Sequence, residues 1–115
     1  MAGSLARDLG AQAEARAAWR LRLTGWRIVA RNWVGGGGEL DLVAARWKTL
    51  LIVEVRRRAS TDAAVQSVDR AKLDRTLNAA AAYVAAYKLQ RYRLRVDVIG
   101  SDASGRMRWS KDVLG

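Results

Sequence analysis

Apolar residues recur along the first half of the chain at helix-like and then strand-like intervals. A helix is predicted for residues 5–23, which are rich in Ala, Leu and Arg and end before Thr24-Gly25. Alternation of apolar and polar residues predicts a strand over 26–31. Two further strand-like runs, 39–44 and 49–57, are joined by a short turn and predict an antiparallel hairpin.

The second half of the chain adds a second helix and two more strands. A polar connection over 58–68 leads to a helix with one apolar stripe. The stripe consists of Leu73, Leu77, Ala80, Ala81 and Val84. A strand over 92–99, a turn over 101–105 and a closing edge strand over 107–109 follow. The order α-β-β-β-α-β-β predicts a single α/β domain spanning residues 1–115.

Glycine and tryptophan residues occur beside the predicted strands. Gly35–Gly38 predict a mobile hairpin tip that admits a nucleic-acid backbone, but no Gly-Lys-Ser/Thr follows as a nucleotide-binding loop requires. Trp33 and Trp47 are expected to lie near the candidate site that the acidic residues described below would form. They are candidates for stacking on bases, although a role in the core is favoured for tryptophan on a small sheet.

The residue types that are missing limit the chemistry. The chain has no Cys and no His, which excludes disulfides, thiol nucleophiles, cysteine-ligated zinc and histidine general bases. Any bound metal must therefore be held by oxygen ligands, and such a site favours Mg²⁺ or Mn²⁺.

The charge balance points to a polyanionic partner. Lys and Arg number 21 against 11 Asp and Glu, a formal net charge of +10. Such a domain is expected to bind nucleic acid, although ribosomal or membrane-surface association would give the same signal. No apolar run reaches the length of a membrane span, and the first residues lack the apolar core of a signal peptide. We therefore expect a cytoplasmic protein with no membrane partner.

Two acidic residues are predicted to face each other across the hairpin. If the turn is centred between Trp47 and Lys48, opposed residues have numbers that sum to 95, so Asp41 faces Glu54. The same register pairs Glu39 with Arg56. Facing carboxylates repel unless a divalent cation binds between them. A solvated strand end would also tolerate the pair, and a slip of one residue would separate it.

Two other charged residues have alternative interpretations. Glu14 lies on the first helix with small and apolar neighbours, so it either reaches inward as a third acidic group or, as periodicity favours, faces solvent. Lys72 is in the first turn of the second helix, where the helix dipole disfavours a cation. It is either positioned for a phosphate or oxyanion, or is an ordinary exposed lysine.

Glu39-Leu40-Asp41, a spacer and then Glu54-Val55-Arg56 after an apolar strand resemble the PD-(D/E)XK nuclease signature. Over roughly residues 10–100 the chain more closely resembles the YraN family of small predicted endonucleases, related to archaeal Holliday-junction resolvases. The matching stretches are residues 14–18, 25–33, 38–44, 52–55, 68–72, 80–84 and 95–99.

This resemblance implies a restriction-endonuclease-like fold, a mixed β-sheet flanked by helices. It implies that Asp41 and Glu54 are metal ligands and that Glu14 is an accessory acid. A water activated by Mg²⁺ or Mn²⁺ would attack a phosphodiester in line. DNA is favoured over RNA as partner, and a homodimer follows by analogy with resolvases, which cut two strands symmetrically.

One position departs from the family pattern, which has lysine where this chain has Arg56. Arginine keeps the charge but does not release a proton near neutral pH. Lys72 is a candidate for the missing amine. Arg57 and Arg58 are predicted to contact phosphate as the strand ends, although charge runs at strand ends are commonly solvated.

Three functions are consistent with these features. The first, which we favour, is a metal-dependent endonuclease acting on DNA, including branched DNA. The second is a catalytically impaired nucleic-acid-binding module, in which Arg56 has replaced the reactive lysine. The third is a basic accessory protein of a ribonucleoprotein assembly.

Overall fold

A computed structural model describes the backbone of residues 2–115 and the side chains of residues 8–115. Five strands form one sheet in the order β1-β2-β3-β4-β5, in which all neighbours are antiparallel except β3 and β4. The elements are α1 (Ala2–Leu23), β1 (Arg27–Gly35), β2 (Gly38–Arg46), β3 (Thr49–Arg57), α2 (Thr61–Gln66), α3 (Arg70–Tyr87), β4 (Arg93–Ser101) and β5 (Met107–Ser110). The predicted mixed sheet flanked by helices is confirmed.

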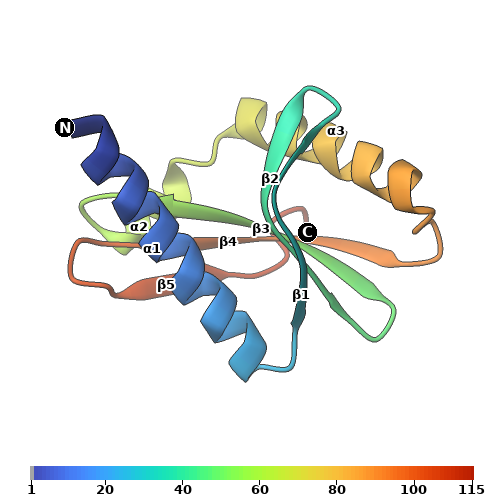
Figure 1. Ribbon diagram of the computed structural model, residues 1–115, viewed down its shortest axis with the longest axis horizontal. Helices are drawn as coiled ribbons and strands as arrows, with labels where there is room; N and C mark the ends of the chain where they lie inside the picture. The colour runs from blue at the N-terminus through green and yellow to red at the C-terminus, as the bar shows by residue number, and fades with distance from the viewer. Residues whose placement is uncertain (1) are drawn as a thin grey trace.

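Helices cover both faces of the sheet (Figure 1). α1 packs on one face through Ala17, Ala18 and Leu21, which meet alternate residues of β3 such as Leu51 and Val53. The other alternate residues of β3 face α3. β3 is therefore buried on both sides, as expected of a central strand that is paired in parallel. None of the helices in the described part of the chain is long and apolar enough to cross a membrane.

The sequence prediction missed α2 and placed a polar connection there. Ser60 caps this helix by accepting a hydrogen bond from the backbone N–H of Ala63 at 3.1 Å. Ala64 is its buried residue and lies against Gly100 of β4, where a Cβ atom would come within 2.8 Å of the Ala64 Cβ. A helix of six residues that buries one alanine leaves almost no periodic signal in the sequence.

The apolar stripe predicted for α3 is rotated relative to the face that the helix buries. The buried residues are Thr76, Ala79, Ala80 and Tyr83. Leu73, Leu77 and Val84 are half-buried, and Ala81 is exposed. The small alanines allow α3 to approach the sheet closely, while the larger leucines lie at the margin of the contact.

The glycine-rich connection is the predicted hairpin tip, and it is a tight turn that contacts α3. Gly36 and Gly37 close the hairpin with φ values of 61° and 80°, which favour glycine. A Cβ atom on Gly36 would lie 2.5 Å from the Asn78 carbonyl oxygen, and one on Gly38 would lie 2.5 Å from that of Arg75. The hairpin therefore reaches the backbone of α3 (Figure 1). This contact fixes β2 relative to α3 beside the predicted acidic pair.

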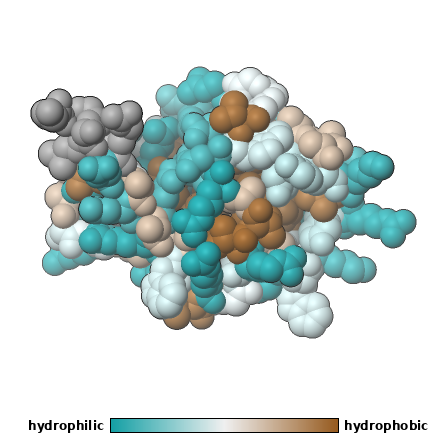
Figure 2. All heavy atoms as spheres, in the orientation of Figure 1, coloured by the Kyte–Doolittle hydropathy of each residue, from teal (hydrophilic) through white to brown (hydrophobic). Residues whose placement is uncertain are grey.

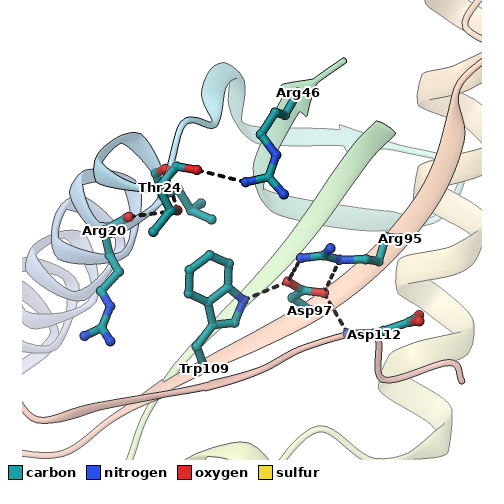
Figure 3. A network of polar contacts seen from close by, with 8 residues as sticks. Arg20, Thr24, Arg46, Arg95, Asp97, Trp109 and Asp112 are labelled. Atoms are coloured by element: carbon teal, nitrogen blue, oxygen red, sulfur yellow. Dashed lines mark hydrogen bonds and ion pairs between the residues drawn. The ribbon is translucent and has the colours of Figure 1, made fainter. Parts of the chain in front are cut away.

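A buried carboxylate ties the end of the chain to β4 (Figure 3). Asp97 is 0% exposed and receives two hydrogen bonds from Arg95, at 3.0 and 2.8 Å. The Trp109 Nε1–H and the backbone N–H of Asp112 donate to the same carboxylate at 2.7 and 2.8 Å. Both oxygens of Asp97 are thus satisfied, which marks a structural group and distinguishes it from the acidic pair described below.

We expect Asp97→Asn to lower the free energy of unfolding by about 3 kcal/mol, because it removes the charge that compensates the partly buried Arg95. Urea denaturation followed by circular dichroism measures the change. Asp112→Asn is the matched control, because its exposed residue contributes a backbone N–H to the network. Equal stability of the two variants would contradict the structural role of Asp97.

Candidate metal centre

The predicted register between β2 and β3 is confirmed. All paired residues, from Leu42↔Val53 to Arg46↔Thr49, have numbers that sum to 95. The ladder ends one step before Asp41 and Glu54. At that point the backbone N–H of Val55 donates to Asp41 Oδ2 at 2.9 Å, so a side chain replaces the backbone acceptor. The two strands part here, and the parting places the Asp41 carboxylate beside β3.

Glu54 is buried with one oxygen bound and the other unsatisfied. The side chain is 1% exposed, and its Oε1 accepts a hydrogen bond from Thr76 Oγ1 at 2.7 Å. Among the described residues, Oε2 has no hydrogen-bond partner. Burial, and next the negative charge of Asp41, raise the pKa of Glu54 to about 7. Thr76 and Lys72 act in the opposite direction and lower that pKa. An unsatisfied buried carboxylate oxygen is costly, and a cation would relieve it.

Lys72 is directed at this carboxylate, so the alternative of an ordinary exposed lysine is wrong. Its Nζ lies 3.7 Å from Glu54 Oε2, and its side chain is 21% exposed. Asp69 caps α3 by accepting the backbone N–H of Lys72 at 2.8 Å. The helix dipole disfavours a positive charge in the first turn of α3, and the Asp69 cap offsets this effect. The ion pair with Glu54 explains why a lysine lies at this position.

Glu14 approaches the same region from the other side of the sheet. It is half-buried, and Asn32 Nδ2 donates a hydrogen bond to its Oε2 at 3.2 Å. Burial raises the pKa of Glu14, the bond from Asn32 lowers it, and the charges of Asp41 and Glu39 raise it further. The fully solvated alternative for Glu14 is therefore wrong, and its carboxylate lies within electrostatic range of the acidic pair.

Asn32 was missed by the sequence analysis. It interrupts β1 with a φ of 50°, a left-handed conformation that asparagine tolerates better than most residues. The flanking pairs, Arg31↔Leu42 and Trp33↔Leu40, place it at the position opposite Asp41. A lone asparagine in an apolar strand is the signal that points to such an irregularity.

The arginines at the end of β3 adjoin a cavity of about 370 Å³. The cavity is lined by Leu9, Gly10, Val55, Arg56, Arg57 and Arg58. Arg56 is half-buried, and its Nε has no hydrogen-bond partner in the described part of the chain. The predicted Glu39–Arg56 ion pair does not occur among the side chains of residues 8–115. β2 has already left β3 at this level, which leaves Glu39 exposed.

Asp41 and Glu54 could supply only part of the coordination sphere of a metal ion. Among the described residues, no three Asp, Glu, His or Cys side chains form a group that could hold a metal. Asp41 and Glu54 are therefore a two-carboxylate arrangement. Mg²⁺ suits such a site, because it commonly binds one or two carboxylates and fills its remaining positions with water and substrate phosphate. The unsatisfied Oε2 of Glu54 fits this use.

The fold and this site define a small mixed α/β protein with an acidic pair at the point where two central strands part. The chain belongs to a family whose model matches residues 13–100 and is described as "Uncharacterised protein family UPF0102". This is the YraN group that the sequence resembles.

Individual relatives support the same assignment. A UPF0102 protein of Methylorubrum populi is 41% identical over 90 residues, which cover 78% of this chain and 68% of the relative. One of Rhizorhabdus wittichii is 39% identical over 90 residues, 78% of this chain and 76% of the relative. One of Dinoroseobacter shibae is 36% identical over 107 residues, 92% of this chain and 80% of the relative.

The raised pKa of Glu54 predicts that stability falls as pH rises. The folded protein keeps the proton up to about pH 7, whereas the unfolded chain loses it near the ordinary value of 4.5. The folded state therefore binds more protons between these values, and unfolding becomes easier across this window. We expect Glu54→Gln to abolish this slope and to be more stable than wild type at pH 8 by about 1–3 kcal/mol. Urea denaturation with a chelator at pH 5 and pH 8 measures both effects; parallel slopes would refute the prediction.

Proposed function

We propose that this protein is a metal-dependent endonuclease that hydrolyses DNA phosphodiesters. One observation carries the proposal: a buried, unsatisfied oxygen of Glu54 lies beside Asp41, with the Lys72 amine 3.7 Å away. Structural ion pairs are normally satisfied on both oxygens, as Asp97 is in this chain. A buried carboxylate left open to one side is arranged for a ligand that the protein does not supply.

The roles of the side chains follow from their positions. Asp41 and Glu54 would hold Mg²⁺ or Mn²⁺, which when bound supplies a hydroxide-like nucleophile and offsets charge on the phosphorus oxygens. Thr76 keeps Glu54 in one orientation through the 2.7 Å hydrogen bond. Glu14 adds negative charge near the site and is the accessory acid.

The arginines at the end of β3 are assigned to the substrate. Arg57 and Arg58 leave the strand beside the cavity, where guanidinium groups suit phosphate oxygens. Arg58 Nη1 donates to the Arg57 carbonyl at 2.8 Å, which directs the exposed side chain along the end of the strand. Branched DNA as substrate and a homodimer that cuts two strands are part of the same proposal, by analogy with resolvases.

Lys72 takes the place of the amine that the family pattern puts at position 56. Arg56 has the charge but cannot exchange a proton near neutral pH. Lys72 contacts Glu54 from α3, so its ammonium group lies where it can orient a water or stabilise an oxyanion. Arg56 is then left with phosphate binding.

We expect Asp41→Asn to abolish Mn²⁺ binding in isothermal titration calorimetry and to abolish cleavage of nicked, flap and four-way junction DNA. One ligand of a two-carboxylate site is lost, and the remaining carboxylate holds the cation weakly. Asp74→Asn is the matched control, since Asp74 is an exposed carboxylate of α3 in a surface pair with Arg70. Wild-type protein that cleaves none of these substrates with Mg²⁺ or Mn²⁺ would count against the enzyme.

The roles of Lys72 and Arg56 are separated by a pair of variants. We expect Lys72→Met to lower the single-turnover cleavage rate at least about 100-fold, the usual cost of removing one positioned group that stabilises an oxyanion. Because Arg56 is assigned to binding, Arg56→Lys should change this rate only slightly. The opposite pattern, a tolerated Lys72→Met with a faster Arg56→Lys, would assign the amine to position 56.

A second candidate function is a nucleic-acid-binding module without turnover, and the arginine at position 56 favours it. This alternative predicts binding that weakens steeply with salt and is unchanged by a chelator. It also predicts that wild type cleaves no DNA and that Asp41→Asn binds DNA with the same affinity as wild type. Cleavage that depends on Asp41 excludes it.

A further inference from the structure

The end of the molecule opposite the acidic pair is formed by three segments held together by hydrogen bonds. They are the start of β1, the β2–β3 turn and the loop between α3 and β4; we call this region the basic-aromatic end. One of these contacts is between backbone groups, the Arg93 N–H donating to the Lys48 carbonyl at 2.7 Å; in the other, the Arg46 side chain donates through Nη1 to the carbonyl of Thr24, just before β1, at 2.8 Å. Figure 1 shows the turn and the α3–β4 loop on the same side of the sheet.

This end is strongly positive. The chain contains no Asp or Glu between residues 15 and 38, between 42 and 53, or between 75 and 96, the stretches that contribute these three segments. The cations here are all exposed, namely Arg27, Arg46, Lys48, Lys88, Arg91 and Arg93. Figure 2 shows hydrophilic side chains projecting from the edge where the α3–β4 loop lies. This end therefore carries exposed positive charges in sequence stretches that contain no carboxylate.

Aromatic side chains accompany the charge. Trp47 is 92% exposed at the tip of the β2–β3 turn, and its φ of 53° is unusual for a bulky residue. The sequence preference for tryptophan in the core is therefore wrong at this position. Neither packing nor turn chemistry explains an exposed tryptophan in a left-handed conformation, where Gly or Asn would be favoured.

A cavity of about 170 Å³ opens at the same end. Three tyrosines contribute to its lining, and its other walls come from β1, the α3–β4 loop and the two strands that meet at the turn. The lining residues are Arg27, Val29, Ala45, Leu50, Tyr83, Tyr87, Leu89 and Tyr92. Tyr83 and Tyr87 lie 4.6 Å apart between ring centroids, and Tyr83 meets Trp33 edge-on at 5.2 Å. Aromatic rings thus extend from the cavity to Trp33 on β1, the strand that pairs with β2 beside Asp41.

We propose that the basic-aromatic end binds an unpaired stretch of a nucleic-acid strand. The exposed arginines and lysines bind phosphates, one base stacks on Trp47, and a second base enters the tyrosine-lined cavity. Flat aromatic groups next to cations are the combination that holds single strands, because every base has a face to stack. Bases in a duplex are already stacked, so this surface selects strands with free bases.

The basic-aromatic end adds a substrate preference to the proposed function. Only one part of this inference rests on the proposed function, namely that the bound strand is the substrate that is cut. Trp47 is six residues from Asp41 along the chain, a separation of about 20 Å at strand geometry, so the expectation that Trp47 lies near the acidic site is wrong. A substrate that occupies both places must have an unpaired segment next to the bond that is cut, such as a flap or a branch. The binding itself does not involve the carboxylates.

A membrane surface is the other anionic partner that attracts cations and tryptophan. The concave cavity and the predominance of arginine argue for nucleic acid instead, since a pocket accepts a base edge-on and guanidinium binds phosphate bidentately. The test below includes vesicles so that the two partners are distinguished.

The experiment measures fluorescence anisotropy of two labelled oligonucleotides of equal length, one of thymidines and one abasic, with excess chelator. Wild type binds the thymidine oligonucleotide more tightly than the abasic one. Trp47→Ala weakens binding of the thymidine oligonucleotide about tenfold and leaves the abasic oligonucleotide nearly unaffected. Trp19→Ala is the matched control, because Trp19 is 61% exposed but lies on α1.

Each outcome decides the proposal. Equal binding of both oligonucleotides by wild type, or unchanged thymidine binding by Trp47→Ala, would overturn it. If Trp47→Ala lost binding to phosphatidylserine vesicles but bound the oligonucleotides as wild type does, the surface would be assigned to a membrane. Chelator prevents hydrolysis, so Trp47-dependent binding by a protein that cleaves nothing would support this surface while the nuclease proposal fails.

Discussion

The burial of Glu54 opposite Asp41 is the constraint on which the other features of the site depend. A buried carboxylate beside a second carboxylate is unfavourable, and the neighbouring elements are arranged to tolerate it. Thr76 donates a hydrogen bond to one oxygen of Glu54, and Lys72 places a positive charge near the other. The backbone N–H of Val55 donates a hydrogen bond to the Asp41 carboxylate. These contacts require β2 to be separated from β3 before Leu42 and α3 to begin at its Asp69 cap. The remaining imbalance, one unsatisfied oxygen, is the feature that a divalent cation would remove.

The sheet register could be predicted because it depends on local information. A two-residue turn at Trp47-Lys48 fixes every cross-strand pair, and the apolar alternation of β3 fixes its faces. Lys72 was harder to interpret, because its position in the helix is unfavourable and its partner is 18 residues away in sequence. α2 was missed because it buries a single alanine, and of the buried face of α3 only Ala80 was predicted, because its other members are an alanine, a threonine and a tyrosine. Asn32 and Trp47 depend on backbone conformations that no hydrophobic pattern encodes.

The β2–β3 hairpin connects the acidic pair to the basic-aromatic end. At one end its strands separate and present the acidic pair, and at the other its turn presents Trp47 among exposed cations. Negative charge is thereby concentrated where a cation would bind and excluded where phosphates would lie. Such a separation of charge would hold the phosphates of a strand at the turn, and a divalent cation bound by the acidic pair would attract the phosphate that lies there. Membership of UPF0102 extends the fold to its relatives, whereas the chemistry rests on the side chains of this chain.

The most direct test of the account is a crystal structure of the protein with Mn²⁺, with the ion located by its anomalous scattering. We expect one strong anomalous peak in contact with carboxylate oxygens of both Asp41 and Glu54, including Glu54 Oε2, which has no hydrogen-bond partner among the described residues. Well-ordered carboxylates with no peak between them at millimolar Mn²⁺ would contradict the shared cation.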